Sequence, residues 1–350
     1  MKDTERVDFK SFNLNELTEY VSSLGEQKFR AKQLYDWLHK KHVASLDDMS
    51  NIPASLKNKL SENGQFISLE PVEVLISKID GTRKYLFGLY DGNVIESVFM
   101  RYKHGNSVCI SSQVGCRMGC RFCASTLDGL TRNLTPSEML EQIYAIERHT
   151  GERVSNVVVM GSGEPMDNFD NIVKFVELLT DANGINISQR NLTISTCGIV
   201  PRINELAEKK LQITLAISLH ASSDEKRKEL MPVANAFSIE ELMEACRNYF
   251  KMTGRRITFE YSLVQGVNDT NEDSERLIKL IRGINCHVNL IPVNPIKERD
   301  YKQSTNKSIE AFKGRLEKSG IQVTIRREMG RDINGACGQL RKSYIEKKSP

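Results

Sequence analysis

Residues 109–126 read CISSQVGCRMGCRFCAST and hold four of the eight cysteines of the chain. Three of these, Cys116, Cys120 and Cys123, form a CxxxCxxC array. Thiolates are preferred ligands of iron–sulfur clusters and of zinc, so the array indicates one metal centre. Structural zinc and an ordinary cubane cluster take four ligands. A cubane on three cysteines leaves one iron open to activate a small molecule. The array therefore predicts a reactive [4Fe-4S] cluster, with zinc as the alternative.

The composition bounds the class of protein. The chain has 350 residues, 27% charged and 39% hydrophobic, which is ordinary for a soluble globular protein. No apolar run approaches the roughly 20 residues of a membrane helix, and the N-terminus lacks a signal-peptide core. Its cysteines gather around one motif instead of forming spaced pairs, which is typical of a reducing compartment. We therefore expect a cytoplasmic protein with no membrane partner.

The net charge of +4 is unevenly distributed. Residues 297–350 contain 14 Lys and Arg against seven Asp and Glu. A basic segment of this kind favours a polyanionic partner, although a solvated surface gives the same pattern. Arginines that could contact phosphates are Arg326, Arg327, Arg331 and Arg341.

Residues 1–68 have the apolar spacing of a small helical domain. Its first helix presents Leu14, Leu17, Val21 and Leu24 on one face and ends at Gly25. Basic residues that would suit RNA docking, or equally a solvated face, lie around the second helix: Lys28, Arg30, Lys32, Lys40 and Lys41.

Residues 69–105 are predicted to form a linking antiparallel β segment. Three strand-like runs, 71–79, 82–90 and 93–102, are separated by Asp-Gly pairs, which favour hairpins. In the third run, Glu96 shares a face with Val94 and Val98. A carboxylate in this alternation lies either at an exposed edge or at a reactive site, and the pattern alone favours the edge.

Residues 106–350 alternate between strands and helices, which predicts an α/β fold with a parallel sheet. Helix starts are indicated at Thr135, Asn168, Pro201, Ser238 and Thr270, and a further helix covers 304–319. The expected strands are 107–112, 156–160, 191–196, 212–219, 256–264, 286–293 and a final one at 321–326. Six βα units predict a partial (βα)6 barrel.

Unusual residues follow these strands, and parallel barrels place their chemistry at the carboxyl ends of strands. The cysteine array follows the first strand and GSGEP (161–165) follows the second. Each position alone has a plain structural explanation, such as a turn or a core histidine. Six coincident strand ends indicate a site, whose remaining members are Ser195, Ser218, Leu219, His220, Asn294 and Cys337.

The CxxxCxxC spacing is that of the radical S-adenosylmethionine (SAM) superfamily, and nearly the whole chain resembles its adenine-C2 RNA methyltransferases. Five motifs carry the resemblance: SSQVGCxxxCxxC, GEP after the second strand, SLH after the fourth, NPI at Asn294, and the terminal GxxIxxACGQL. The sequence departs from it at Ser162, where many relatives have Met. The alternatives are the sister C8-methylating resistance enzyme, a zinc-holding RNA-binding module without catalysis, and another radical-SAM enzyme that acts on a small substrate. Pro165 favours the C2 branch, since the C8 enzyme has Ala there.

The resemblance implies a cytoplasmic, monomeric radical-SAM methyltransferase with a helical RNA-binding N-terminal domain. Its substrates would be 23S rRNA and tRNA, and flavodoxin or ferredoxin would supply electrons. Cys116, Cys120 and Cys123 would hold a [4Fe-4S] cluster, and each turnover would use two SAM molecules. The implied SAM contacts are Gly163, Glu164, Ser195, Ser218, Leu219, His220 and Asn294.

The resemblance also implies a carrier and a resolving thiol. Cys337 would take a methyl group from the first SAM, and its thiomethylene radical would add to C2 of adenine. Cys109 would then remove the C2 proton and release the product by forming a disulfide with Cys337, while Glu96 matches the proton acceptor of the family. Three cysteines match no motif and are interpreted as core: Cys197, Cys246 and Cys286.

Overall fold

The computed structural model describes residues 6–293 and 301–333. Its N-terminal segment contains α1 (Leu14–Ser23), α2 (Phe29–His39) and α3 (Ala54–Asn63), with 3-10 turns η1 (Phe9–Ser11) and η2 (Leu46–Asp48). A capping box starts α1, because the Asn13 side chain accepts from the Glu16 amide while the Glu16 carboxylate accepts from the Asn13 amide. The predicted helical character of the N-terminal region is confirmed.

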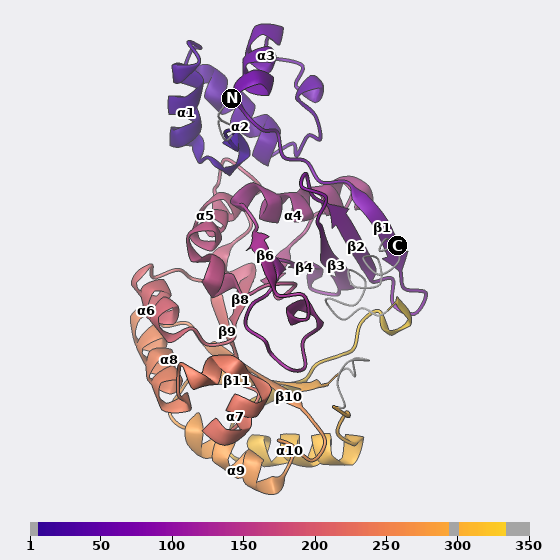
Figure 1. Cartoon of the computed structure of the whole chain (residues 1–350), viewed down its shortest axis with the longest axis vertical. Helices are drawn as coiled ribbons and strands as arrows, with labels where there is room; N and C mark the ends of the chain where they lie inside the picture. Colours follow the sequence, from indigo (N-terminus) through magenta and orange to yellow (C-terminus); the bar gives the residue numbers. More distant parts are fainter. Residues whose placement is uncertain (1–5, 294–300, 334–350) are drawn as a thin grey trace.

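This helical segment packs at one end of the molecule against α4 (Pro136–Thr150) and α5 (Phe169–Thr180) (Figure 1). The contact is partly ionic: Lys10 Nζ lies 2.7 Å from Glu141 Oε1, and both side chains are fully buried. Tyr35 donates to Asp181 at 2.7 Å. Apolar residues of the segment belong to the same core cluster as the sheet, so the two parts share one interior.

One sheet of ten strands runs through the rest of the chain, in the order β1-β2-β3-β4-β7-β8-β9-β10-β11-β12. Strands β1 (Pro71–Ile76), β2 (Arg83–Gly88) and β3 (Val94–Tyr102) form the predicted antiparallel meander, and β3 pairs antiparallel with β4 (Gly105–Ile110). The meander is therefore hydrogen-bonded into the barrel sheet. The expectation of an edge position for Glu96 is wrong, because β3 lies between β2 and β4 and Glu96 is 1% exposed.

The parallel part confirms six βα units followed by a last strand. Its later strands are β7 (Asn156–Val159), β8 (Leu192–Thr196), β9 (Thr214–Ser218), β10 (Ile257–Leu263), β11 (Cys286–Pro292) and β12 (Gln322–Ile325). The later helices are α6 (Val200–Glu208), α7 (Asp224–Leu230), α8 (Ile239–Thr253), α9 (Asn271–Leu280) and α10 (Asn306–Lys318). Figure 1 shows α6, α8, α9 and α10 along the outside of the curved sheet.

The two faces of the sheet differ because successive strand residues point to opposite sides. Ile217, Phe259 and Leu290 point outward into the apolar core, and Tyr261 packs against Phe312 of α10 with ring centroids 5.3 Å apart. The opposite, inner face holds the polar residues of the same strands.

After β12, the chain crosses back to the meander. Asp332 accepts from Ser77 Oγ at 2.6 Å and from the Lys78 amide at 2.8 Å, and the Gly330 amide donates to Asp80 at 2.9 Å. Residues 326–333 thereby connect the last strand of the sheet to the β1–β2 turn. No helix in the described ranges is long and apolar enough to span a membrane.

Candidate active site

The cysteine loop is framed by a small hairpin that the sequence did not predict, β5 (Gln113–Gly115) paired with β6 (Leu130–Asn133). At its mouth the Cys116 amide donates to the Gly129 carbonyl at 2.8 Å. Gly115 has a φ of 78°, and a Cβ there would lie 2.0 Å from the Gly129 oxygen. Only glycine allows the two strands to meet this closely.

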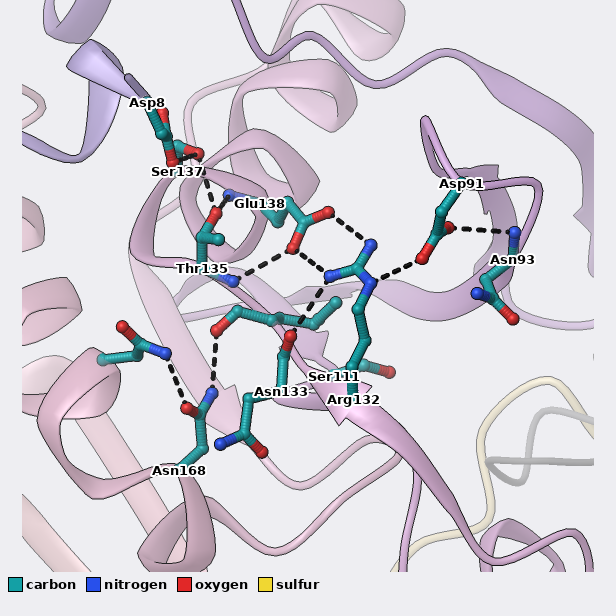
Figure 2. Close-up of polar contacts among 12 residues, drawn as sticks. Asp8, Asp91, Asn93, Ser111, Arg132, Asn133, Thr135, Ser137, Glu138 and Asn168 are labelled. Atoms are coloured by element: carbon teal, nitrogen blue, oxygen red, sulfur yellow. Dashed lines mark hydrogen bonds and ion pairs between the residues drawn. The ribbon is translucent and has the colours of Figure 1, made fainter. Parts of the chain in front are cut away.

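Arg132 of β6 anchors the hairpin to the barrel. Its guanidinium makes two 2.8 Å hydrogen bonds to Glu138 in the first turn of α4 and a third to Asp91 in the β2–β3 turn, as Figure 2 shows. Glu138 also completes the capping box of Thr135. The frame of the cysteine loop is thus fixed to a helix start and to the meander.

The three motif thiols lie close enough to act on one another. Burial raises the pKa of Cys116 to about 12, with a further contribution from Cys123. Burial also raises the pKa of Cys120, and Cys123 and Cys116 add to the effect. Three thiolates in an apolar setting repel one another, and the positive charge of iron would offset that repulsion.

The surroundings of these thiols fit an iron–sulfur cluster. A small apolar cluster around Cys120 includes Leu230, Met231 and the half-buried Met118 and Phe122. Within the described ranges, no three His, Cys, Asp or Glu side chains are placed to hold a single metal ion. A cubane is larger than one ion and each cysteine binds a different iron, so its ligands need not converge on one point.

The GSGEP turn packs directly against the segment before the cysteines. The amides of Ser112 and Gln113 donate to the Ser162 carbonyl at 2.9 and 3.1 Å. Gly163 has a φ of 109°, and a Cβ there would lie 2.6 Å from Gln113 Cβ. Ser162, the position that departs from the family pattern, places its hydroxyl 3.1 Å from that of Ser125 in the cysteine loop. A serine therefore ties this turn to the loop.

Glu164 links the segments that follow β7 and β8 through hydrogen bonds. Its carboxylate accepts from the Cys197 amide at 2.7 Å and from the Met166 amide at 3.0 Å. Burial raises its pKa, against the opposing effect of these hydrogen bonds. Cys197 is buried, as expected, but it belongs to the same apolar cluster as Cys120 and so forms part of the site wall.

The carboxyl ends of β8 and β9 also lie close together. Ser195 and Ser218 come from adjacent strands, and their hydroxyl oxygens lie 3.4 Å apart. Leu219 is fully buried. The His220 ring meets Phe122 of the cysteine loop edge-on, with centroids 4.7 Å apart. The structure thus brings the SLH motif against the cluster loop.

His220 is held in one orientation and one protonation state. Its φ is 55°, a region costly for a residue other than glycine. The Ser262 amide donates to Nδ1 at 2.9 Å, so the proton of the neutral ring is on Nε2, and Asn268 donates to the His220 carbonyl at 2.7 Å. Burial, with help from Arg227, lowers its pKa to about 3. The ring is neutral at physiological pH, and hydrogen bonds from Ser262 and Asn268 fix its orientation.

Cys109 and Glu96 share the inner face of the sheet. Cys109 on β4 pairs with Val98 on β3, so Glu96 is its diagonal neighbour on the same face. Glu96 Oε2 lies 3.2 Å from Lys84 Nζ, and this ion pair is buried. Asn294 and Cys337 lie outside the described residues.

Two inner-face residues were missed by the sequence analysis. Glu260 on β10 is 6% exposed and accepts from Asn289 of β11 at 2.8 Å. The signal was present, because a charged residue interrupts the apolar run ITFEYSL of β10.

Comparison with known proteins agrees with this geometry. Residues 110–281 match the radical SAM superfamily, and residues 7–65 match the ribosomal RNA large subunit methyltransferase N-terminal domain. The probable dual-specificity RNA methyltransferase RlmN of Lachnospira eligens is 66% identical over 340 residues, covering 97% of each chain. The chain belongs to the RlmN family. The RlmN protein of Clostridium novyi is 58% identical over 96% of this chain and 98% of its own.

A solved structure shows the same fold. The radical SAM methyltransferase of Sphaerobacter thermophilus superposes with a TM-score of 0.91 at 40% identity, covering 95% of this chain and 98% of the other. As an RlmN-type radical SAM RNA methyltransferase, the protein belongs to a superfamily whose members use a [4Fe-4S] cluster and SAM. Its fold is the radical-SAM partial barrel that the sequence predicted.

Proposed function

We propose that the protein methylates C2 of an adenine in 23S rRNA and in tRNA, with Cys337 as methyl carrier and Cys109 as resolving thiol. C2 lies between two ring nitrogens and is electron-poor, so a polar methyl transfer from SAM would fail there. When bound, the cluster and two SAM molecules supply a methyl group and a radical. Pro165 favours C2 over the C8 alternative.

The inner-face position of Cys109 carries this proposal. Cys109 is 5% exposed and lies next to the strand of Glu96. Residues 326–333 return the chain to the same meander, and Cys337 follows Ile333 by four residues. Four residues of chain reach at most about 14 Å. This supports an encounter of two cysteines that are 228 positions apart in the sequence.

Each residue then has a distinct role. Cys337 holds the carbon that becomes bonded to C2. Cys109 or Glu96 takes the C2 proton, and the unpaired electron that radical addition leaves on the base would pass to the cluster. The Cys109 thiolate then attacks the sulfur of Cys337. The Cys109–Cys337 disulfide forms as the bond between that sulfur and the transferred carbon breaks, and the carbon keeps the bonding electron pair and takes up a proton to become the methyl group. Cys116, Cys120 and Cys123 would hold the cluster, and Gly163, Glu164, Ser195, Ser218, Leu219, His220 and Asn294 would contact SAM. We further propose a cytoplasmic monomer reduced by flavodoxin or ferredoxin, with domain limits of 1–68, 69–105 and 106–350.

Replacing Cys109 tests the proposal. Cys109→Ala should block only the final step, so protein covalently joined to RNA accumulates as a nuclease-sensitive shifted band. Adding Cys337→Ala should remove the band, because no carbon is loaded. Cys286→Ala, at a half-buried position on β11, is the matched control and should turn over without an adduct. Normal turnover by Cys109→Ala would contradict the resolving role.

A further inference from the structure

A row of polar side chains crosses the inner face of the sheet from β8 to β12. It begins with Ser195 and Ser218, whose hydroxyl oxygens lie 3.4 Å apart. Ser218 is in register with Glu260, which is in register with Asn289, which is in register with Thr324. Side chains in register on adjacent strands lie side by side on one face. The family motifs account for the two serines and leave the other three residues without a role.

The hydrogen bonds of this row have one direction. A carboxylate only accepts, so Asn289 turns its amide nitrogen to Glu260 Oε2, at 2.8 Å. The Asn289 oxygen then faces Thr324, whose hydroxyl donates to it at 3.1 Å. Having given its one proton, Thr324 accepts from His287 Nε2 at 3.0 Å. Every donor points toward Glu260, which is therefore the end of the chain of hydrogen bonds.

Glu260 retains hydrogen-bonding capacity toward the interior. Asn289 reaches Oε2, and within the described ranges no hydrogen bond is made to Oε1. Burial raises the pKa of Glu260, against smaller effects of Asn289 and Arg326. A carboxylate accepts from an amine, and a protonated carboxyl group can also donate to an adjacent ring nitrogen. This is the pattern that the amine edge of adenine presents.

The row faces the strand that carries the proposed chemistry. Arg326 follows β12 and acts electrostatically on both Glu260 of β10 and Tyr102 of β3. Cys109 is in register, strand by strand, with Val158, Thr193 and Thr214, and Thr214 shares its face with Ser218, the partner of Glu260. Glu96, Cys109 and Glu260 therefore line the same inner face of the sheet. A base between them would meet the carboxyl of Glu260.

We propose that Glu260 binds the exocyclic amine edge of the methyl-accepting adenine, with Asn289 and Thr324 as positioning residues. The inference rests on the proposed function, and it assigns to Glu260 the selection of adenine that this function requires. Leaving a buried donor or acceptor without its hydrogen-bond partner changes kcat/KM by roughly 10- to 100-fold.

The test compares RNA substrates that carry adenine or purine, which lacks the amine, at the target position. For the unaltered protein, kcat/KM should be roughly 10- to 100-fold higher with adenine. Glu260→Met should lose this preference, with little change for the purine RNA. Thr258→Val, two residues earlier on the same face of β10, is the matched control and should keep it. Asn289→Ala should weaken the preference without removing the carboxyl.

Measurements of SAM binding and iron content distinguish a role of Glu260 in binding the base from a role in binding SAM. SAM binding and iron content should be unchanged in Glu260→Met, which shows that the site is intact. Weaker SAM binding with an unchanged adenine preference would place Glu260 at SAM and overturn the inference, as would an unchanged preference in both Glu260→Met and Asn289→Ala. Methylation by the unaltered protein at a carbon other than C2 would refute the proposed function, and the purine comparison would still test Glu260.

Discussion

Replacing Lys10 with Met should destabilise the junction between the helical segment and the barrel. Lys10 Nζ donates to the Ile67 carbonyl at 2.5 Å and to Glu141 at 2.7 Å, and both charged side chains are fully buried. Met keeps most of the volume of Lys and removes its charge. Removing one partner of a buried ion pair costs about 3–5 kcal/mol.

The other partners of Glu141 should keep the loss of stability near the lower end of that range. Arg148 still lies 2.9 Å from Glu141 Oε2, and the Leu69 amide donates to the same oxygen at 3.1 Å. We therefore expect Lys10→Met to lower the free energy of unfolding by about 3 kcal/mol near pH 7, measured by urea denaturation. The double variant with Glu141→Gln removes the buried carboxylate that Lys10 no longer balances, but it also leaves Arg148 without that partner, so it should recover only part of the loss.

The dependence on pH gives a second check. Burial acts to raise the pKa of Glu141, but Lys10 and Arg148 outweigh it, so its pKa in the folded protein lies below the ordinary value of 4.5. Its stabilising effect is present above that value and is lost as the pH falls through the folded pKa. Without Lys10 the carboxyl becomes protonated more readily, which relieves the buried charge. The difference in unfolding free energy between the unaltered protein and Lys10→Met should therefore become smaller below pH 4.5. A loss under about 1 kcal/mol at pH 7, or a difference independent of pH, would refute this reasoning.

Three further predictions concern the site. Cys120→Ala should abolish bound iron, measured after anaerobic purification, and retention of a full cluster would refute its assignment as a ligand. Gly115→Ala should also reduce iron content, because its Cβ would lie 2.0 Å from the Gly129 oxygen; Gly129→Ala, also at positive φ but with open space around it, should keep the cluster at a cost of about 1 kcal/mol. For His220, the folded pKa of about 3 lies below the ordinary 6.5, so its stabilising effect is present above 6.5 and is lost as the pH falls toward 3. His220→Gln should have a flatter stability profile over that window in urea titrations, and parallel profiles would show that His220 does not titrate as described.

Sequence patterns predicted the elements and the site because both depend on local chemistry. Capping boxes at Thr135 and Ser238 indicated helix starts that the structure confirms within one residue, and the helix start predicted at Thr270 is confirmed as well. The strand-end rule predicted that Ser195, Ser218 and His220 lie near one another, since parallel strands align their carboxyl ends. The thiol spacing indicated a metal centre for a similar reason, because three ligands of one cluster can come from a single loop.

Pairing between distant segments required the tertiary structure. The alternation of polar and apolar residues showed which side chains share a face with Glu96. It could not show that β4 would pair with β3, because the sequence pattern is the same for an edge strand and an interior strand. Glu260 and Asn289 are 29 positions apart, and only the register of β10 with β11 joins them. Lys10 and Glu141 are 131 positions apart, and nothing near either residue indicates its partner. Local sequence determines what each segment can form, whereas the register of the sheet and the docking of the helical segment decide which buried charges meet.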